Sequence, residues 1–292
     1  MAAWWHDFVG GVVGGSAGIF VGHPLDTIKL QLQTGQRAGV ADAVRAAAST
    51  GGLWKGLLSP LLGNVPIQAI LFGTYGSTLR WLEGGQVSDT PQLSSVVLAG
   101  QAAGLVQLVA MCPTEHFKIL VQQQAAGGTP VGRAAYTGSI DCAIDIWRGH
   151  GLRGVYKGVW ACFVRDVGIC SYGMYYGVYE VVRQRLLVAP EGGATRQIHP
   201  LKTIAAGAAC GLVSWSWCYP FDVIKSKVQA TPFSVEAVTP IGRVAKVIWQ
   251  TQGWRGFFAG YSVMAVRSVP SNAATFFGYE LTMSFLNGDD DK

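Results

Sequence analysis

Three copies of one short motif constrain this 292-residue chain more than any other feature of its sequence. The motif reads Pro-x-Asp/Glu-x-x-Lys, and each copy closes an apolar stretch and has a glutamine four residues after its lysine. A second block, an aromatic residue two positions before a glycine, follows each copy, and its glycines are spaced 102 residues apart. The residues are Asp26, Lys29 and Gln33, then Glu115, Lys118 and Gln122, then Asp222, Lys225 and Gln229, with Gly56, Gly158 and Gly260 in the second block. Copies in register predict three tandem repeats.

The composition indicates that these repeats lie in a membrane. Half of the residues are hydrophobic and only 13% are charged, whereas a soluble domain carries about 25% charged residues. The net charge of +5 is not gathered into a basic run, which argues against nucleic acid as a partner. The six cysteines form no CxxC pair and the five histidines do not cluster, so we expect no metal and no cofactor. We also expect no enzyme activity, because the sequence offers no paired nucleophile and base.

Six apolar stretches are candidates for membrane-spanning helices, although a hydropathy window would undercount them because several carry polar residues in mid-span. They cover residues 5–33, 60–82, 93–122, 160–186, 201–229 and 262–286. The loop segments 24–55, 113–157 and 220–255 hold 14 of the 22 basic residues against 7 acidic ones. This asymmetry places those loops on the positive side of the membrane and both termini on the other side.

With these motifs, the chain resembles the mitochondrial carrier family over nearly its whole length. The resemblance implies an all-α membrane protein of three tandem repeats, each two transmembrane helices plus a short matrix helix, in a six-helix pseudo-three-fold bundle. The repeats would cover residues 1–90, 91–195 and 196–288, followed by an acidic C-terminal tail at 289–292. It also implies a monomer of the mitochondrial inner membrane that moves a small-molecule substrate by alternating access.

The family arrangement pairs each motif acid with a lysine of a different repeat, which would close a gate on the matrix side. It implies the pairs Asp26–Lys118, Glu115–Lys225 and Asp222–Lys29, braced by Gln33, Gln122 and Gln229. A static bundle held together by the same pairs is the alternative. The cytoplasmic gate is expected to be weaker, with Glu180, Arg183 and Glu280 supplying one bridge from Arg183 to Glu280.

The turns at Gly56 and Gly158, together with Gly138, resemble the cardiolipin-binding turns of the family. Backbone amides at a helix start would hold the lipid phosphate there. An ordinary interfacial anchor of aromatic and basic residues is the alternative.

The three-fold register also locates candidate substrate residues without a structure. It places Arg165 and Asp166 on the fourth span, Arg267 on the sixth, and Asn64 and Gln68 on the second, and formal charges at that depth are expected to face water. A guanidinium can hold a carboxylate through two parallel hydrogen bonds, and an adjacent acid can hold an ammonium.

This set of residues is similar to that of the carnitine/acylcarnitine and basic amino-acid branch of the family, which implies an antiporter of amino compounds. Four alternatives stay open: a structural salt bridge at Asp166, a dicarboxylate carrier, a nucleotide carrier, and a membrane scaffold that no longer transports. Gly168 departs from the proline expected after Arg165 and Asp166, which leaves the local helix geometry open.

Overall fold

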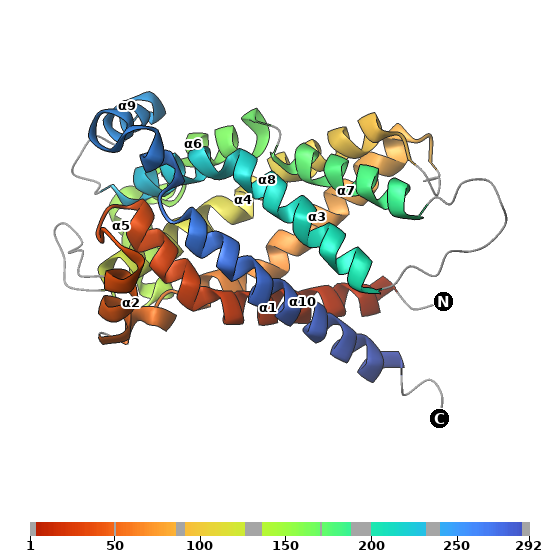
Figure 1. The fold of residues 1–292 in the computed structure, drawn as a ribbon, viewed down its shortest axis with the longest axis horizontal. Helices are drawn as coiled ribbons and strands as arrows, with labels where there is room; N and C mark the ends of the chain where they lie inside the picture. Colours follow the sequence, from red (N-terminus) through yellow and green to blue (C-terminus); the bar gives the residue numbers. More distant parts are fainter. Residues whose placement is uncertain are drawn as a thin grey trace. The chain divides into compact units, whose positions relative to one another are not determined.

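A computed structural model describes residues 4–49, 51–85, 91–125, 136–169, 171–187, 200–231 and 240–287, and these ranges hold helices and turns but no strand. Five long helices coincide with five of the six apolar stretches, and shorter helices connect them (Figure 1). The elements are α1 Trp4–Gln33, α2 Val40–Ser49, η1 Gly52–Trp54, α3 Leu58–Leu82, α4 Leu93–Ala125, α5 Ser139–Val155, α6 Val159–Phe163, η2 Val164–Gly168, α7 Ser171–Leu187, α8 Pro200–Ala230, α9 Ile241–Gln252, η3 Gly253–Phe258 and α10 Tyr261–Asn287. The predicted all-α fold is confirmed; the expected tail at 289–292 lies outside the described residues.

The long helices continue through their prolines instead of ending there. Each of α1, α3, α4, α8 and α10 holds one proline inside the helix. A proline removes one backbone hydrogen bond and bends a helix at that point. By length and hydropathy, two stretches of the described chain qualify as membrane spans, Gly52–Leu82 with mean hydropathy 1.4 and Leu93–Gln124 with 1.7. The undercount predicted from the sequence is therefore confirmed.

The fourth apolar stretch is interrupted in its middle. After α6, the chain forms one π-helical segment, η2, in which Ile169 N–H donates to Val164 O over 3.1 Å, and α7 begins at Ser171. A π-helix is rare and is frequently found at functional sites. The unusual geometry therefore coincides with the position where glycine stands in place of the expected proline.

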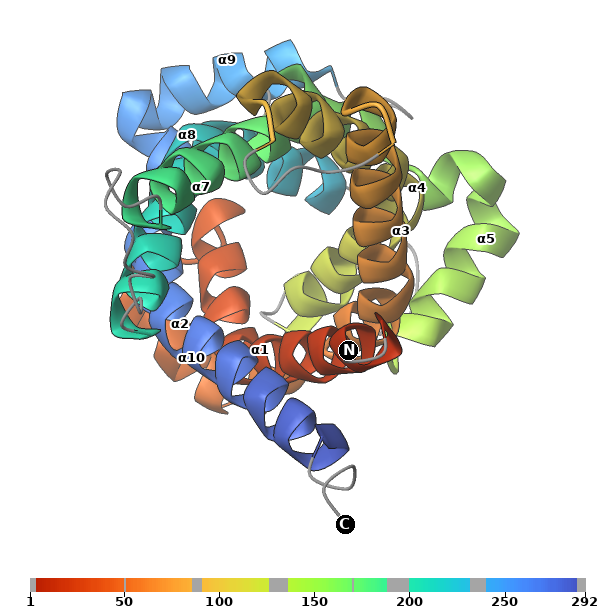
Figure 2. The same cartoon turned by 90° about the vertical axis from the view of Figure 1, so that its right-hand side faces the viewer.

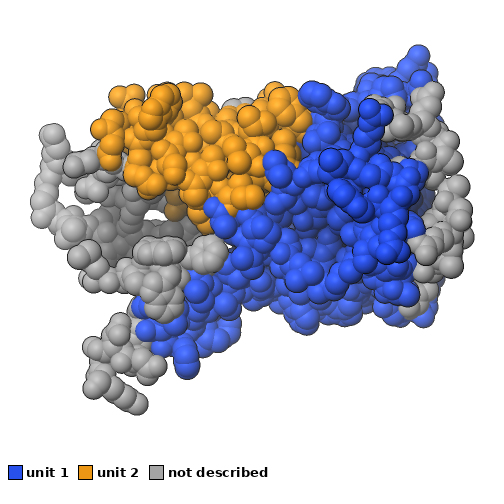
Figure 3. Space-filling model, turned by 180° about the vertical axis from the view of Figure 1, so that it is seen from behind, with its two compact units in different colours: residues 1–69, 109–162, 220–292 blue, residues 70–108, 163–219 orange. Residues whose placement is uncertain are grey.

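The chain divides into two compact units, which Figure 3 shows in separate colours. Unit 1 comprises residues 1–69, 109–162 and 220–292, and unit 2 comprises residues 70–108 and 163–219. Unit 1 includes α2, α5 and α9, which all lie at the left end of Figure 1 and bury Ala43, Ile146 and Ile248 respectively.

Small residues let α1 and α10 approach closely within unit 1, where the two helices lie side by side in both views (Figures 1 and 2). A Cβ added at Gly10 would come within 2.8 Å of the Tyr279 ring, and one at Gly14 would collide with the backbone of Thr275. In unit 2, Gly100 and Gly104 play the same part against the tyrosines of α7. Both glycine series therefore serve helix packing.

Candidate functional site

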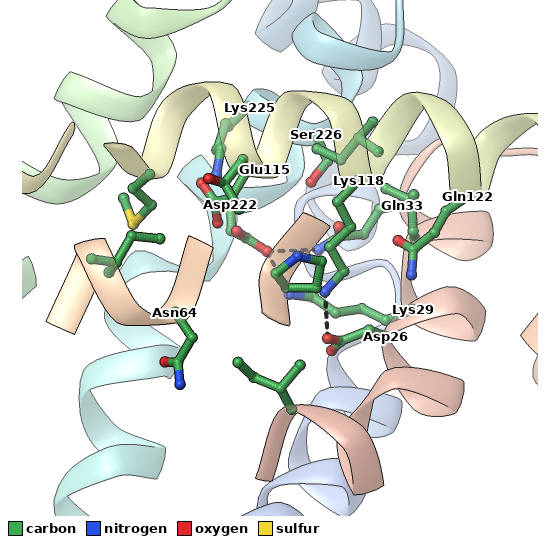
Figure 4. Close-up of a pocket in the computed structure, with 17 residues that line it drawn as sticks. Asp26, Lys29, Gln33, Asn64, Glu115, Lys118, Gln122, Asp222, Lys225 and Ser226 are labelled. Carbon is green, nitrogen blue, oxygen red and sulfur yellow. Dashed lines mark hydrogen bonds and ion pairs between the residues drawn. The ribbon is translucent and has the colours of Figure 1, made fainter. Parts of the chain in front are cut away.

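Three ion pairs link the three Pro-x-Asp/Glu-x-x-Lys copies into a closed ring in unit 1 (Figure 4). The acid and the lysine of each copy are three positions apart and so share one face of their helix. Each lysine then reaches the acid of another copy, so that α1 is joined to α4, α4 to α8 and α8 to α1. The pairs of this ring are Lys118–Asp26 at 2.6 Å, Lys29–Asp222 at 2.7 Å, and Lys225–Glu115. The structure thus brings together the same partners that the resemblance to the carrier family implied.

The three glutamines below the ring make different contacts. Gln33 Nε2 donates to Asp222 Oδ2 over 3.0 Å and so contacts an ion pair directly. Gln122 Nε2 donates instead to Thr27 Oγ1 over 2.9 Å, one residue from Asp26. Gln229 Nε2 faces the thiols of two buried cysteines, with Cys162 Sγ at 3.5 Å. Among the described contacts of the three expected braces, Gln33 bonds to a ring residue, whereas Gln122 and Gln229 bond to side chains next to the ring.

Asp26 holds a second cation besides its ring lysine. Arg267 Nε from α10 lies 2.5 Å from Asp26 Oδ1, in an ion pair that is not aligned as a hydrogen bond. Gly22 makes this approach possible, because a Cβ there would come within 2.9 Å of Arg267 Nε. The sequence analysis placed Arg267 in the substrate site, with a salt bridge to Asp166 as the alternative, and it did not predict the contact with Asp26. The spacing of the motifs does not show which side chain can reach a residue on another helix, as Arg267 reaches Asp26.

The ring lines a cavity of about 270 Å³ in unit 1 (Figure 4). Asn64 from α3 lines it too, although its Nδ2 is fixed by hydrogen bonds to Val12 O at 3.1 Å and Ser16 Oγ at 3.2 Å. Gln68 follows one turn later on α3 and is half-buried. These two positions belong to unit 1, like Arg267.

Arg165 and Asp166 form a buried pair in unit 2. Arg165 Nε donates to Asp166 Oδ1 over 2.6 Å and Arg165 Nη2 donates to Asp166 Oδ2 over 2.9 Å, and the two residues are only 6% and 3% exposed. They line a cavity of about 220 Å³ whose other lining residues are Ser171, Tyr172, Tyr175, Trp215 and Cys218. In this structure the two charges therefore neutralise each other, as the salt-bridge alternative expected.

The sequence reasoning missed the tyrosines of this cavity. Tyr172 and Tyr175 stand three positions apart at the start of α7 and share one helix face. This spacing could have predicted that both tyrosines line one cavity. The motif register did not find them because it compares equivalent positions in repeats, and the interruption before α7 shifts the helix that follows.

Comparison with known proteins decides the family. The model of the mitochondrial carrier protein family matches residues 2–86, 89–189 and 196–290. The chain belongs to the mitochondrial carrier family. It is a multi-pass solute carrier of the mitochondrial inner membrane, built from the repeats of that family.

Three relatives show how widely the named solutes of such carriers differ. A mitochondrial basic amino acids transporter of Rattus norvegicus is 37% identical over 98% of this chain and 91% of that protein. A mitochondrial carnitine/acylcarnitine carrier protein of Homo sapiens is 33% identical over 96% of this chain and 94% of that protein. Mitochondrial magnesium exporter 1 of Drosophila melanogaster is 34% identical over the same shares, 96% and 94%.

The structure describes the side chains of only two of the three residues that are expected at the cytoplasmic gate of the carrier. Glu180 on α7 is buried, and Glu280 on α10 is exposed. Arg183 belongs to α7, but its side chain lies outside the described residues. The bridge from Arg183 to Glu280 stays a prediction.

The turns at Gly56 and Gly158, which are expected to bind cardiolipin, share one backbone conformation with the equivalent turn at Gly260. Gly56, Gly158 and Gly260 have φ values of 82°, 78° and 78°, which only glycine adopts without strain. Gly138 differs, since it precedes α5 in an extended conformation.

The turns at Gly56 and Gly158 pack closely against Gln122 and Gln229. A Cβ at Gly56 would lie 3.3 Å from Gln122 Cγ, and one at Gly158 would lie 2.8 Å from Gln229 Cγ. The turns are therefore packed directly against side chains of the neighbouring repeats.

Proposed function

We propose that this carrier exchanges amino compounds, either basic amino acids or carnitine-like zwitterions, across the mitochondrial inner membrane. The observation that carries the proposal is the Arg165–Asp166 pair in its cavity, which offers a guanidinium for a carboxylate and a carboxylate for an ammonium. The names of two relatives, a basic amino acids transporter and a carnitine/acylcarnitine carrier protein, support the same substrate class.

Each charge of this pair must exchange its protein partner for a substrate group. A buried ion pair loses much of its attraction to the cost of desolvation, so replacing one partner by a charged substrate group is not prohibitive. The carboxylate of a zwitterion can take the place of Asp166 at Arg165, while its ammonium takes the place of Arg165 at Asp166. A dicarboxylate or a nucleotide lacks the cation that Asp166 would then require.

Arg267 extends the proposal to the matrix gate. It lies at the ring through Asp26, so a substrate carboxylate that draws Arg267 away removes one of the two cations that hold that acid. Substrate binding and loosening of the ring would then be one event. Ion pairs suit such a gate because they can re-form after every cycle.

Cardiolipin is the lipid we propose at the turns. Near Gly158 a cavity of about 720 Å³ is lined by Arg153 and Lys157 and by Pro240 and Ile241 at the start of α9. The first amides of a helix have no partner within the helix and favour an anionic group. Two basic side chains and a helix start around one space suit a lipid phosphate.

Exchange in proteoliposomes tests the substrate class. Vesicles containing the carrier are preloaded with lysine, arginine, ornithine or carnitine, and uptake of the labelled solute is compared for wild type, Arg165→Ala and Asp166→Asn. We expect uptake that needs an internal substrate and collapses in both variants, because each leaves a buried charge without its partner.

Matched controls are Arg80→Ala and Asp42→Asn, which change exposed residues and should exchange at the wild-type rate. Parallel vesicles are loaded with malate, ADP or magnesium. Exchange of one of these instead of the amino compounds would refute the substrate class, and no exchange from folded protein would favour a scaffold.

A further inference from the structure

The interruption of the fourth membrane span frees backbone groups inside a membrane-spanning segment. The π-helical segment η2 ends at Gly168, and α7 begins at Ser171. The last carbonyls before such an interruption and the first amides after it lack partners within their own helices. In a membrane these groups must find hydrogen bonds in neighbouring helices or side chains.

One side chain serves both sides of this interruption. Gln101 on α4 donates from Nε2 to Val167 O over 2.8 Å, and its Oε1 accepts from Gly173 N–H over 3.0 Å. Two other carbonyls are also satisfied by side chains, because Ser171 Oγ donates to Arg165 O and Trp217 Nε1 donates to Ile169 O. The Gln101 amide comes from a different helix and bonds to the chain both before and after the interruption.

Packing fixes the position of that amide. Gly100 and Gly104 stand on either side of it along α4, and a Cβ at either would come within 2.8 Å of a tyrosine ring of α7. The two helices are therefore close enough for a glutamine side chain, held by two bonds, to bridge them. A donor and an acceptor on one planar group match the carbonyl and the amide that the interruption exposes.

We propose that Gln101 is a positioning residue for the Arg165–Asp166 pair, joining the two halves of the interrupted span so that the pair is held in its cavity. Val167 directly follows Asp166, so a bond to Val167 O fixes the turn that carries both charges. The inference rests on the proposed function, because it explains how the Arg165–Asp166 pair, the proposed substrate site, is held in place. Discontinuous membrane helices are also where secondary transporters place their substrate sites.

The first test uses a titratable substitute and needs no substrate. Gln101→Glu keeps the acceptor for Gly173 N–H but can donate to Val167 O only when its carboxyl is protonated. We therefore expect its thermal stability, relative to wild type, to rise as the pH falls from 8 to 5.5. Gln101→Leu, of similar size and without a polar group, is the matched control and should show no such relative rise.

The neighbouring titratable groups have to be considered in this test. Among the described residues they are Arg165 and Asp166 on η2, Tyr172, Tyr175, Tyr176 and Glu180 on α7, Tyr75 on α3 and Cys218 on α8. All of them are present in wild type and in Gln101→Leu as well, so the difference between variants isolates position 101.

The second test reads positioning through transport. For Gln101→Leu we expect KM for the exchanged amino compound to rise about tenfold, since two buried backbone groups lose their partner. Gln101→Glu should recover part of that loss at pH 5.5 but not at pH 8. Equal KM values for wild type and Gln101→Leu, with Gln101→Glu following wild type in its pH profile, would overturn the proposal.

The two tests also separate this inference from the proposed function. If wild type moves none of the amino compounds, the proposed substrate class fails, while the pH dependence of stability still tests the bridge. If Gln101→Leu cannot be folded, the stability of Gln101→Glu between pH 5.5 and 8 decides alone, and a profile parallel to wild type counts against the bridge.

Discussion

At the scale of single residues, Asp26 differs from the other two acids of the ring. It is shared between a lysine that all three repeats supply and Arg267, whose equivalent position holds Arg165 in the second repeat but Gly63 in the first. A symmetric gate is thereby tied at one point to a residue that breaks the symmetry. Through Arg267, a substrate without three-fold symmetry can affect one ion pair of the three-fold ring.

Arg267→Lys separates the two tasks of this arginine. A lysine can still neutralise Asp26, but as a point charge it cannot hold a carboxylate through two parallel bonds. We expect thermal stability close to wild type and a KM for amino-compound exchange raised about tenfold, which corresponds to about 1.4 kcal/mol.

Arg267→Ala is the comparison variant, and it should lose both stability and affinity. A KM unchanged in Arg267→Lys would show that the substrate carboxylate is held elsewhere.

Lys157 provides a pH prediction outside the membrane spans. Burial lowers the pKa of this lysine to about 8, and its ammonium donates to Thr231 O. Since the unfolded chain binds more protons between about pH 8 and the ordinary lysine pKa, the free energy of unfolding should rise with pH across that window. Thermal unfolding in detergent should show this rise in wild type and lose it in Lys157→Met.

The exposed Lys246 supplies the control, since Lys246→Met should keep the wild-type profile. Added cardiolipin should flatten the rise in wild type, because a nearby phosphate favours the charged form of Lys157. If the dependence of thermal stability on pH is the same with and without cardiolipin, a phosphate in the adjoining cavity is ruled out.

At this scale the sequence predicted the partners within the ring but not the contacts around it. The six ring residues recur at one spacing, and the resemblance to the family implied which acid pairs with which lysine, because three-fold symmetry alone allows two pairing directions. The contact of Arg267 with Asp26 depends on Gly22, one turn before Asp26 on α1, and the sequence carries no pattern for such a triplet.

At the scale of elements, the α1–α10 contact depends on which face of α1 each glycine occupies. Gly14 meets the backbone of Thr275, whereas nothing lies within 4 Å of a Cβ at Gly11. Gly14→Ala should therefore lower the free energy of unfolding by about 1–3 kcal/mol, as overpacking does.

Gly11→Ala is the matched control on the same helix. It should be neutral or slightly stabilising, because alanine favours a helix by about 1 kcal/mol over glycine. Thermal unfolding of the two purified variants measures the difference, and equal midpoints would contradict the close packing of this pair.

The interrupted fourth span was the element that the sequence could not predict. At the equivalent position, α3 and α10 hold a proline and still continue as single helices, so the residue at this position does not by itself predict an interruption. The break is instead stabilised by side chains of α4 and α8, such as Gln101 and Trp217, whose sequence neighbourhood gives no sign of that role. The five uninterrupted spans could be predicted because each is one apolar stretch.

At the scale of the whole molecule, the ring joins helices from all three repeats, so its pairs can be exchanged across the chain. Lys29→Asp or Asp222→Lys alone places two like charges together, and breaking a buried pair costs about 3–5 kcal/mol. We expect either single variant to lose exchange and thermal stability, and the double variant Lys29→Asp/Asp222→Lys to regain part of both.

Exchange rates and unfolding midpoints of the four proteins complete a double-mutant cycle. If the single variants transport like wild type, the ring is no gate. If the singles lose stability but the double variant regains stability without exchange, the pair holds the fold and its polarity matters for transport.

The charges around the ring and at Arg165 and Asp166 cancel in pairs, which leaves Arg267 as one cation in excess among these groups. Moving one charge through a potential of 100 mV is worth about 2.3 kcal/mol, so voltage should alter how fast the empty or zwitterion-loaded carrier reorients. Over a full cycle that charge travels out and back. Exchange of external lysine for internal arginine moves equal charges in opposite directions and should produce no current. Exchange of external lysine for internal carnitine, a neutral zwitterion, should produce a current of one charge per turnover.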